Sequence, residues 1–349
     1  MMKKRKFMYL GLIAAASFVS CSDDDDSSTD DIADESDRAE LYVTSTNSGD
    51  VTVYDFTTST PMQKTIAASG SSNEGVYYNA GDDEVYVVSR SENQVNTYAD
   101  TAVLFRHPLL DLETGLSSQS DLDSPRKIAV NGSTLVVADN ADVDGDEATA
   151  DGRFFVYTKS GSDITLRNIV TVDFAVWGIA FKGNDLLAVV DKTSDLAIFD
   201  NFATANTTNA EVAASKTITI EGIVRTHGLT YDSDDDMLVM TDIGDSTVDS
   251  DGGFHVITGA TSKINAVDNG GTLSVNNQIR VAGASTFLRN PVDIAYDEET
   301  ETIFIAEAAN GGGRVLAFSE VDYLDGGDIA PSVNNTLSGA NSLFYYEED

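Results

Sequence analysis

The sequence predicts an all-β protein, a six-bladed β-propeller with four-stranded antiparallel blades. Three observations predict it: short apolar runs bounded by turn residues, their recurrence about every fifty residues, and an incomplete unit at each end of the chain. The clearest unit runs from Val176 to Asp200. Its three apolar runs are rich in β-branched and aromatic residues and are separated by Gly, Asn, Asp and Ser, which is typical of consecutive antiparallel strands.

Each repeated unit begins with a strand that we expect to line the centre of the ring. The candidates are Gly75–Tyr78, Lys127–Val130, Gly178–Phe181, Gly228–Tyr231, Asp293–Tyr296 and Ser342–Tyr345. Second strands are expected at Val85–Ser89, Leu135–Asp139, Leu187–Asp191, Leu238–Asp242 and Ile303–Glu307. Third strands are expected at Val95–Tyr98, Phe154–Tyr157, Leu196–Asp200, Phe254–Ile257 and Val315–Phe318.

The two ends of the repeat region are complementary. Leu41–Thr44 and Val51–Tyr54 look like second and third strands without a first strand before them, whereas Leu343–Tyr346 is a first strand with nothing after it. We therefore expect the first blade to be completed by both termini, which leaves no open sheet edge in the ring. Seven blades are the alternative, with a degenerate blade around Thr272–Val281; we favour an elaborated outer strand there.

The N-terminal segment has the features of an export signal. Lys3 to Lys6 are basic, and the apolar run Phe7–Val19 that follows is too short to span a bilayer. Phe18-Val19-Ser20-Cys21 resembles a bacterial lipobox, although Phe18 stands where Leu is usual. The resemblance implies a signal peptide over residues 1–20 and lipidation of Cys21; the alternative is an ordinary signal peptide with an incidental cysteine.

An acidic segment, Ser22 to Ser28, follows the cysteine and is expected to stay disordered as part of a tether over residues 21–38. Ser followed by acids after the lipidated cysteine resembles the lipoprotein export signal of Bacteroidetes. That resemblance implies a lipid-anchored protein of the outer membrane, exposed at the cell surface. A periplasm-facing lipoprotein is the alternative. The propeller is then expected over residues 39–349.

Composition excludes some classes of partner. The chain has 58 acidic and 21 basic residues and a net charge of −37, so it repels nucleic acid and anionic head groups. Membrane association is therefore expected through the lipid anchor only. Cys21 is the single cysteine, so the fold rests on packing and sheet pairing, or on metal ions, and not on disulfides.

The blade pattern, Gly-Ile-Ala, then Leu-x-Val-x-Asp, then Arg or Asp before an apolar third strand, resembles NHL-type repeats of six-bladed, TolB-like propellers. Arg153, Asp195 and Arg314 mark the units that match best. The resemblance covers nearly the whole repeat region. It implies the propeller fold, which hosts binding proteins, lyases and lactonases alike.

Two rings of residues are expected at the face where the inner strands begin. The first ring should line the mouth of the central channel: Glu74, Arg126, Trp177, His227, Val292 and Asn341. All of these except Val292 are candidate ligand-binding residues. Trp177 is suited to stacking on a sugar or another flat ligand, or else plugs the channel. Glu74 and His227 are candidate acid and base, the alternative being a structural histidine.

The second ring ends the second strands: Ser45, Ser89, Asp139, Asp191, Asp242 and Glu307. Repeated acids at one position indicate either a functional ring or caps that accept backbone N–H bonds from the next turn.

Gluconolactonase-like propellers hold a divalent cation at the positions just before the inner strands, and Glu74-Gly75 and Asn341 resemble their ligands. Arg126, Trp177 and His227 occupy the other matching positions, and a guanidinium there opposes cation binding.

A separate loop has the spacing of a calcium site. Asn140, Asp142, Asp144 and Asp151 occupy positions 1, 3, 5 and 12 of an EF-hand-like loop, with Gly145 at position 6 and Asp146 at position 7. Because strands flank it, the loop resembles the Asp-rich hairpins of integrin-type propellers. Calcium is therefore the expected cofactor, and a solvated acidic loop is the alternative.

Together these features predict a surface-anchored, non-catalytic lipoprotein propeller. Its partner, a glycan, small molecule or protein, is expected at the channel mouth. The alternative is a metal-dependent lactonase or lyase using Glu74, His227 and Asn341.

Overall fold

A computed structural model describes residues 38–58, 61–105, 112–146, 148–245 and 247–348. The expected signal peptide, Cys21 and the tether up to residue 37 lie outside the described residues. None of the helices in the described ranges is both long enough and apolar enough to cross a bilayer.

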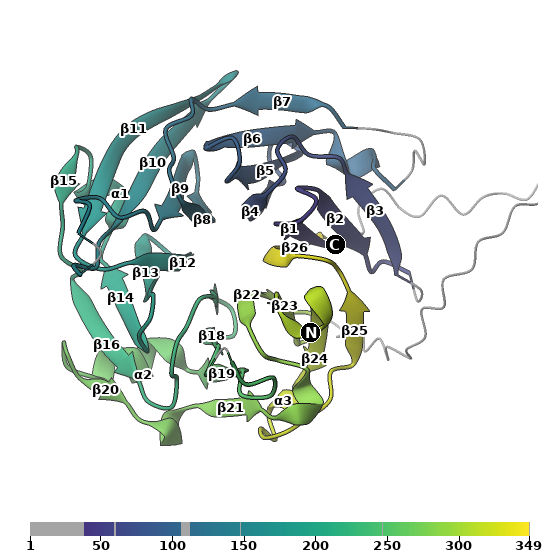
Figure 1. Cartoon of the computed structure of the whole chain (residues 1–349), viewed down its shortest axis with the longest axis vertical. Helices are drawn as coiled ribbons and strands as arrows, with labels where there is room; N and C mark the ends of the chain where they lie inside the picture. Colours follow the sequence, from purple (N-terminus) through teal and green to yellow (C-terminus); the bar gives the residue numbers. More distant parts are fainter. Residues whose placement is uncertain (1–37, 59–60, 106–111, 147, 246, 349) are drawn as a thin grey trace, which may run out of the picture.

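Six sheets stand in a ring around a central axis, which confirms the six-bladed propeller (Figure 1). From the centre outward, blade one contains β26 (Ala340–Glu348), β1 (Arg38–Ser45), β2 (Val51–Asp55) and β3 (Met62–Ile66). Blade two contains β4 (Asn73–Asn79), β5 (Glu84–Ser89), β6 (Gln94–Ala99) and β7 (Thr114–Ser117). Blade three contains β8 (Pro125–Asn131), β9 (Thr134–Asp139), β10 (Gly152–Ser160), β11 (Asp163–Val172) and β15 (Ala210–Glu211).

Blade four contains β12 (Val176–Lys182), β13 (Asp185–Val190), β14 (Asp195–Phe199), β16 (Lys216–Ile220) and β20 (Thr272–Leu273). Blade five contains β17 (Leu229–Asp232), β18 (Met237–Asp242), β19 (Gly253–Thr258) and β21 (Ile279–Ala282). Blade six contains β22 (Pro291–Asp297), β23 (Thr302–Glu307), β24 (Arg314–Ser319) and β25 (Val333–Thr336).

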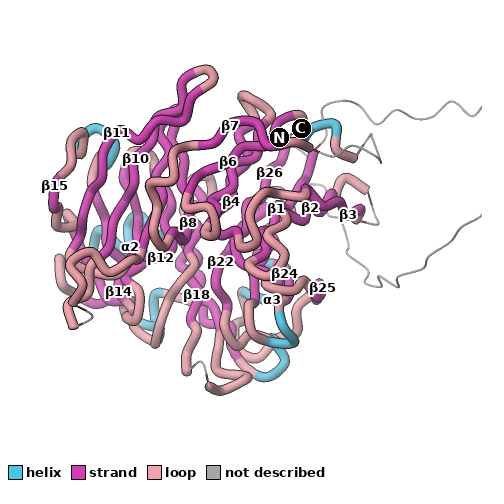
Figure 2. Tube along the Cα trace, turned by 45° about the horizontal axis from the view of Figure 1, so that its top comes forward, coloured by secondary structure: helices cyan, strands magenta, loops and turns pink. Residues whose placement is uncertain are grey.

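Short helical segments lie in the connections between strands (Figure 2). They are α1 (Phe202–Ala205), α2 (Ala260–Ala266), α3 (Glu320–Tyr323) and the 3-10 turns Thr101–Val103, Val275–Asn277, Ala284–Thr286 and Asn310–Gly312.

Both termini complete blade one, as predicted. β26 pairs antiparallel with β1, so that Leu343 lies opposite Val43 and Phe344 opposite Tyr42. Leu343 is buried in the core between blades one and six, together with Leu41 and Phe304. The last strand of the chain therefore supplies both backbone pairing and apolar packing to the first blade.

The segment that suggested a seventh blade is divided between two neighbours. Thr272–Leu273 forms β20, a fifth strand parallel to β16 of blade four, and Ile279–Ala282 forms β21, the outer strand of blade five. A second two-residue strand, β15, extends blade three in the same way. These additions correct the expectation of four strands in every blade. They cover outer edges that would otherwise expose unpaired backbone groups.

Apolar side chains of adjacent blades meet in separate cores between the sheets. Between blades three and four, the ring of Phe154 packs edge-on against Phe199 and Phe202, with centroids 5.4 Å away in each case. Because every strand alternates its side chains between its two faces, each blade contributes to the core on either side of it.

The ring has two faces, which we name by what they hold. Inner strands begin at the mouth face, where Asn73 starts β4 and pairs with Ser89 at the end of β5. Inner strands end at the opposite face, which we call the cavity face because a central cavity lies there.

Candidate functional site

The predicted mouth residues come together at the mouth face. Arg126, Trp177, His227, Val292 and Asn341 line one small cavity of about 10 Å³. That volume has room for about one water molecule. Glu74 joins the group through a hydrogen bond from Arg126. The side chains themselves therefore fill most of this end of the channel.

A stack of three side chains bridges the mouth. The guanidinium carbon of Arg126 lies 4.2 Å from the centroid of the Trp177 ring, and the His227 ring lies parallel to Trp177 with centroids 3.6 Å apart. Since the residues come from blades three, four and five, the stack ties consecutive blades together. This arrangement supports the interpretation of Trp177 as a plug, and its contact with a ligand stays a prediction.

Glu74 is held by arginines. Its Oε1 accepts hydrogen bonds from Arg126 at 3.0 Å and from Arg90 at 3.2 Å, and the residue is 1% exposed. Burial raises the pKa of Glu74 and lowers that of Arg126, although each charge stabilises the other. Two guanidiniums beside one carboxylate oppose a divalent cation at this position.

His227 faces an acid of the neighbouring blade. Its Nε2 lies 3.2 Å from Oδ1 of Asp191, which also accepts a hydrogen bond from Arg225 at 3.0 Å. Burial lowers the pKa of His227, so the ring is neutral at pH 7. A carboxylate only accepts, so Nε2 carries the proton and Nδ1 is the acceptor. Among the described residues Nδ1 has no partner.

The acids that end the second strands cap loops. Glu307 accepts backbone N–H bonds from Arg289, Asn290, Ala309 and Asn310, all within 2.9 Å. Asp139 and Asp242 do the same for the loops beside them. The structure therefore supports the capping interpretation for these three acids. Asp191 also caps, at Lys192, but its remaining bonds go to blade five.

The predicted calcium loop brings three of its five candidate ligands together. Carboxylate oxygens of Asp142, Asp144 and Asp151 lie within 4.8 Å of one another. Asn140 instead points its Oδ1 to Arg126 and Ser124, at 2.9 Å from each donor. The remaining candidate, Asp146, accepts the backbone N–H of Ala148 at 3.1 Å. A hard cation fits the three converging carboxylates, with further oxygens from water or backbone.

A narrow layer separates the mouth from the rest of the channel. It contains the residue before the first aliphatic position of each inner strand: Gly75, Lys127, Gly178, Gly228, Asp293 and Ser342. Strands approach closely here, since a Cβ on Gly178 would lie 2.3 Å from the backbone oxygen of His227.

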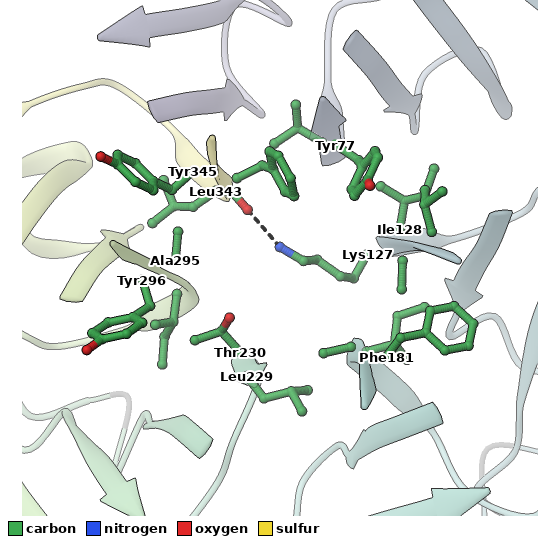
Figure 3. A pocket seen from close by; sticks show the side chains of 17 residues that line it. Tyr77, Lys127, Ile128, Phe181, Leu229, Thr230, Ala295, Tyr296, Leu343 and Tyr345 are labelled. Carbon is green, nitrogen blue, oxygen red and sulfur yellow. Dashed lines mark hydrogen bonds between the residues drawn. The ribbon is translucent and has the colours of Figure 1, made fainter. Parts of the chain in front are cut away.

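The side chain of Lys127 crosses the channel within this layer and closes it. Its ammonium crosses from blade three to blades six and one, where it pairs with Asp293 and donates to Ser342 Oγ at 3.1 Å. It also donates to the carbonyl oxygen of Leu343 at 2.9 Å (Figure 3). All three of its protons are thus used, and its charge is matched by a buried carboxylate.

On the far side of Lys127, a cavity of about 220 Å³ opens toward the cavity face. Its first layer is aliphatic in all six blades: Val76, Ile128, Ile179, Leu229, Ile294 and Leu343. The second layer is uneven, because Ala129, Ala180, Thr230 and Ala295 are small whereas Tyr77 and Phe344 are large. These two rings contact each other, with centroids 4.5 Å apart. Farther out lie Phe181, Tyr296 and Tyr345 (Figure 3).

This cavity was not among the predicted sites. A signal was present, however, in the inner strands themselves. Their third residues are small in four blades and aromatic in two, an unevenness that packing between blades does not require. Lys127 also stands where the other inner strands have Gly, Asp or Ser. Both departures from the repeat face the channel.

Comparison with known proteins gives similarity of structure only. No protein-family model matches the chain, and no curated protein matches it significantly. Among solved structures, a chain of the nidogen/laminin complex superposes with a TM-score of 0.56 and 13% identity, covering 88% of this chain and 98% of that one.

Two bacterial proteins are similar to the same degree. A "putative 6-phosphogluconolactonase" of Bacteroides fragilis has a TM-score of 0.54 and 13% identity, covering 92% of this chain and 100% of its own. Its counterpart from Bacteroides uniformis has a TM-score of 0.53 and 13% identity, with coverage of 86% and 83%. At this identity the superpositions establish one thing: the chain has the β-propeller fold.

Proposed function

We propose that the chain is a surface-anchored lipoprotein whose propeller binds a ligand or partner without catalysing a reaction. The observation that carries the proposal is the division of the channel by Lys127. On one side, the titratable groups of the mouth are bonded to one another; on the other, a blind cavity remains open to a ligand. A blind, largely apolar cavity is the usual form of a small-molecule site.

The mouth is the second surface of this proposal. Trp177 and Asn341 are only partly buried there, and the loop with Asp142, Asp144 and Asp151 lies at the same face. A glycan or protein is therefore the expected partner at that face. Trp177 is the single tryptophan, so its fluorescence reports on the mouth alone. Glycan and protein arrays probed with the chain from residue 22, followed by fluorescence titration of each hit, test this prediction. Absence of hits on both arrays contradicts binding at the mouth.

Anchoring is proposed from the lipobox-like segment and is tested separately. Metabolic labelling with a palmitate analogue is expected to mark the wild-type chain and not a Cys21→Ser variant. Protease treatment of intact cells is expected to remove the labelled chain if it faces the medium. Protection from protease in intact cells supports the periplasm-facing alternative.

A metal-dependent lactonase is the second candidate, because two of the similar structures carry a lactonase name. Glu74, His227 and Asn341 are the candidate residues. The contacts of Glu74 with two arginines count against it. Turnover of a lactone panel with added Ca²⁺ or Mg²⁺, lost in Glu74→Gln, would establish the enzyme and overturn the binding proposal.

A further inference from the structure

We infer that the blind cavity on the far side of Lys127 binds a small organic cation: an ammonium group carried on an apolar body about the size of one six-membered ring. The inference rests on the proposed binding function and narrows it to one class of ligand at one end of the channel.

The volume of the cavity limits the apolar body. At about 220 Å³ it exceeds the roughly 150 Å³ of an engineered apolar cavity that holds benzene. Lys127 closes the inner end, so a chain cannot thread through to the mouth. A single ring with a short substituent therefore fits, lying on the aliphatic layer beside Tyr77 and Phe344.

The cation at the closed end does not repel such a ligand strongly. Lys127 is paired with Asp293, and its other protons are donated to Ser342 and Leu343. The pair has no net charge, but Lys127 and not Asp293 lines the cavity, so the ammonium group of a ligand is expected at the entrance and not at this end. Other lysines near this face are paired or lie elsewhere. Lys182 and Lys216 line a different cavity between blades four and five, and Lys159 pairs with Asp82 and Glu84.

Acidic residues gather at the cavity face on the hairpins of blades five and six, next to Tyr296. Tyr296, which lines the cavity, donates its hydroxyl to Asp235 at 2.7 Å. Glu298 lies two residues beyond Tyr296, and burial together with the charges of nearby acids raises its pKa. Those acids are Asp232, Asp234, Asp235 and Asp297. Like charges gathered at an entrance attract cations and repel anions.

Aromatic rings stand at the same level as these acids. Tyr296 and Tyr345 are half-buried at the wide end of the cavity (Figure 3). An ammonium group is attracted by ring faces as well as by carboxylates. The ligand is therefore oriented with its ring inward and its charge at the entrance, near Asp235 and Glu298.

Three probes with one ring test the charge preference: cyclohexylammonium, cyclohexanol and cyclohexanecarboxylate, titrated by calorimetry into the chain from residue 22. We expect cyclohexylammonium to bind at least about tenfold more tightly than cyclohexanol, with salt weakening only the cation. The carboxylate is expected to bind least. Trp177 fluorescence is expected to stay unchanged, because the mouth lies beyond Lys127.

Variants test whether the cation binds in the cavity beside Asp235 and Glu298. Asp235→Asn with Glu298→Gln is expected to weaken cyclohexylammonium about fivefold and to leave cyclohexanol unchanged. A matched control, Asp144→Asn with Asp146→Asn, removes the same charge from the mouth face and should change the affinity less than about twofold. Thr230→Leu fills the cavity and should abolish binding of both probes; circular dichroism and melting confirm its folding, and Ala180→Leu replaces it if it does not fold.

The outcomes separate the two proposals. Equal binding of ammonium and alcohol, preference for the carboxylate, or no binding of any probe overturns the inference about the cation. None of these results is evidence for catalysis. The proposed binding function is tested separately, by the arrays and the lactone panel described above.

Discussion

Replacing Lys127 by Met should strongly destabilise the propeller, because the lysine is the partner of a buried carboxylate. Side chains of Lys127 and Asp293 are only 12% and 3% exposed. After the substitution Asp293 keeps hydrogen bonds from Ser342 Oγ at 2.8 Å and Leu343 N at 2.7 Å but loses its positive partner. Removing one member of a buried ion pair typically costs about 3–5 kcal/mol.

The two remaining neutral donors place the expected cost at the lower end, about 3 kcal/mol. Asp293→Asn leaves the Lys127 ammonium without a charged partner and should lower the free energy of unfolding by a similar amount. The double variant buries no unpaired charge, so we expect it to lose only about 1–2 kcal/mol relative to wild type. Coupling between the sites is then about 4 kcal/mol or more.

Urea unfolding of the four proteins measures this cycle, with calorimetric melting as a second readout. A loss of 3 kcal/mol should lower Tm by about 4–5 °C in a domain of about 310 residues. A cycle on the exposed pair Arg289 and Asp249, 34% and 82% exposed, is the control and should show little coupling. Additive effects at Lys127 and Asp293 would refute the contact across the channel and, with it, the closed inner end of the cavity.

Three further outcomes are expected. Deleting residues 342–349 should leave the chain unfolded or aggregated, since it removes most of the inner strand of blade one; a melting curve like that of the full chain would contradict closure by the termini. Burial lowers the pKa of His227, so as the pH falls below about 6.5 the unfolded chain takes up a proton more readily than the folded chain, and stability should decrease. That fall should shrink in His227→Gln, and an identical pH profile would show that another group is responsible. Calcium should bind with a Kd of about 10⁻⁴–10⁻³ M by calorimetry, and Asp142→Ala with Asp144→Ala should abolish the heat; equal heats from both proteins would exclude the loop.

Inner, second and third strands could be predicted because burial forces each of them to be apolar. Most outer strands could not: β3 reads Met-Gln-Lys-Thr-Ile and β25 reads Val-Asn-Asn-Thr, and both are largely solvent-facing. An edge strand that packs on one side only needs few apolar residues, so its sequence resembles that of a loop. The two-residue strands β15 and β20 carry even less signal.

The period of the repeat placed the mouth residues correctly, but not their partners. Arg90 reaches Glu74 from a loop of blade two, and the stack of Arg126, Trp177 and His227 depends on how closely the blades approach. The span of Lys127 likewise depends on the width of the ring. Such distances follow from the packing of all six cores, which no local pattern of sequence encodes.

The direction of β1 shows at which face of the propeller the preceding residues join it. Arg38 pairs with Glu348 and Ser45 with Ala340, so β1 starts at the cavity face and the preceding residues join the ring there. With a lipid on Cys21, residues 21–37 would span at most about 60 Å when fully extended. The attachment point would then lie at the cavity face, and Trp177 would lie at the opposite end of the channel from it.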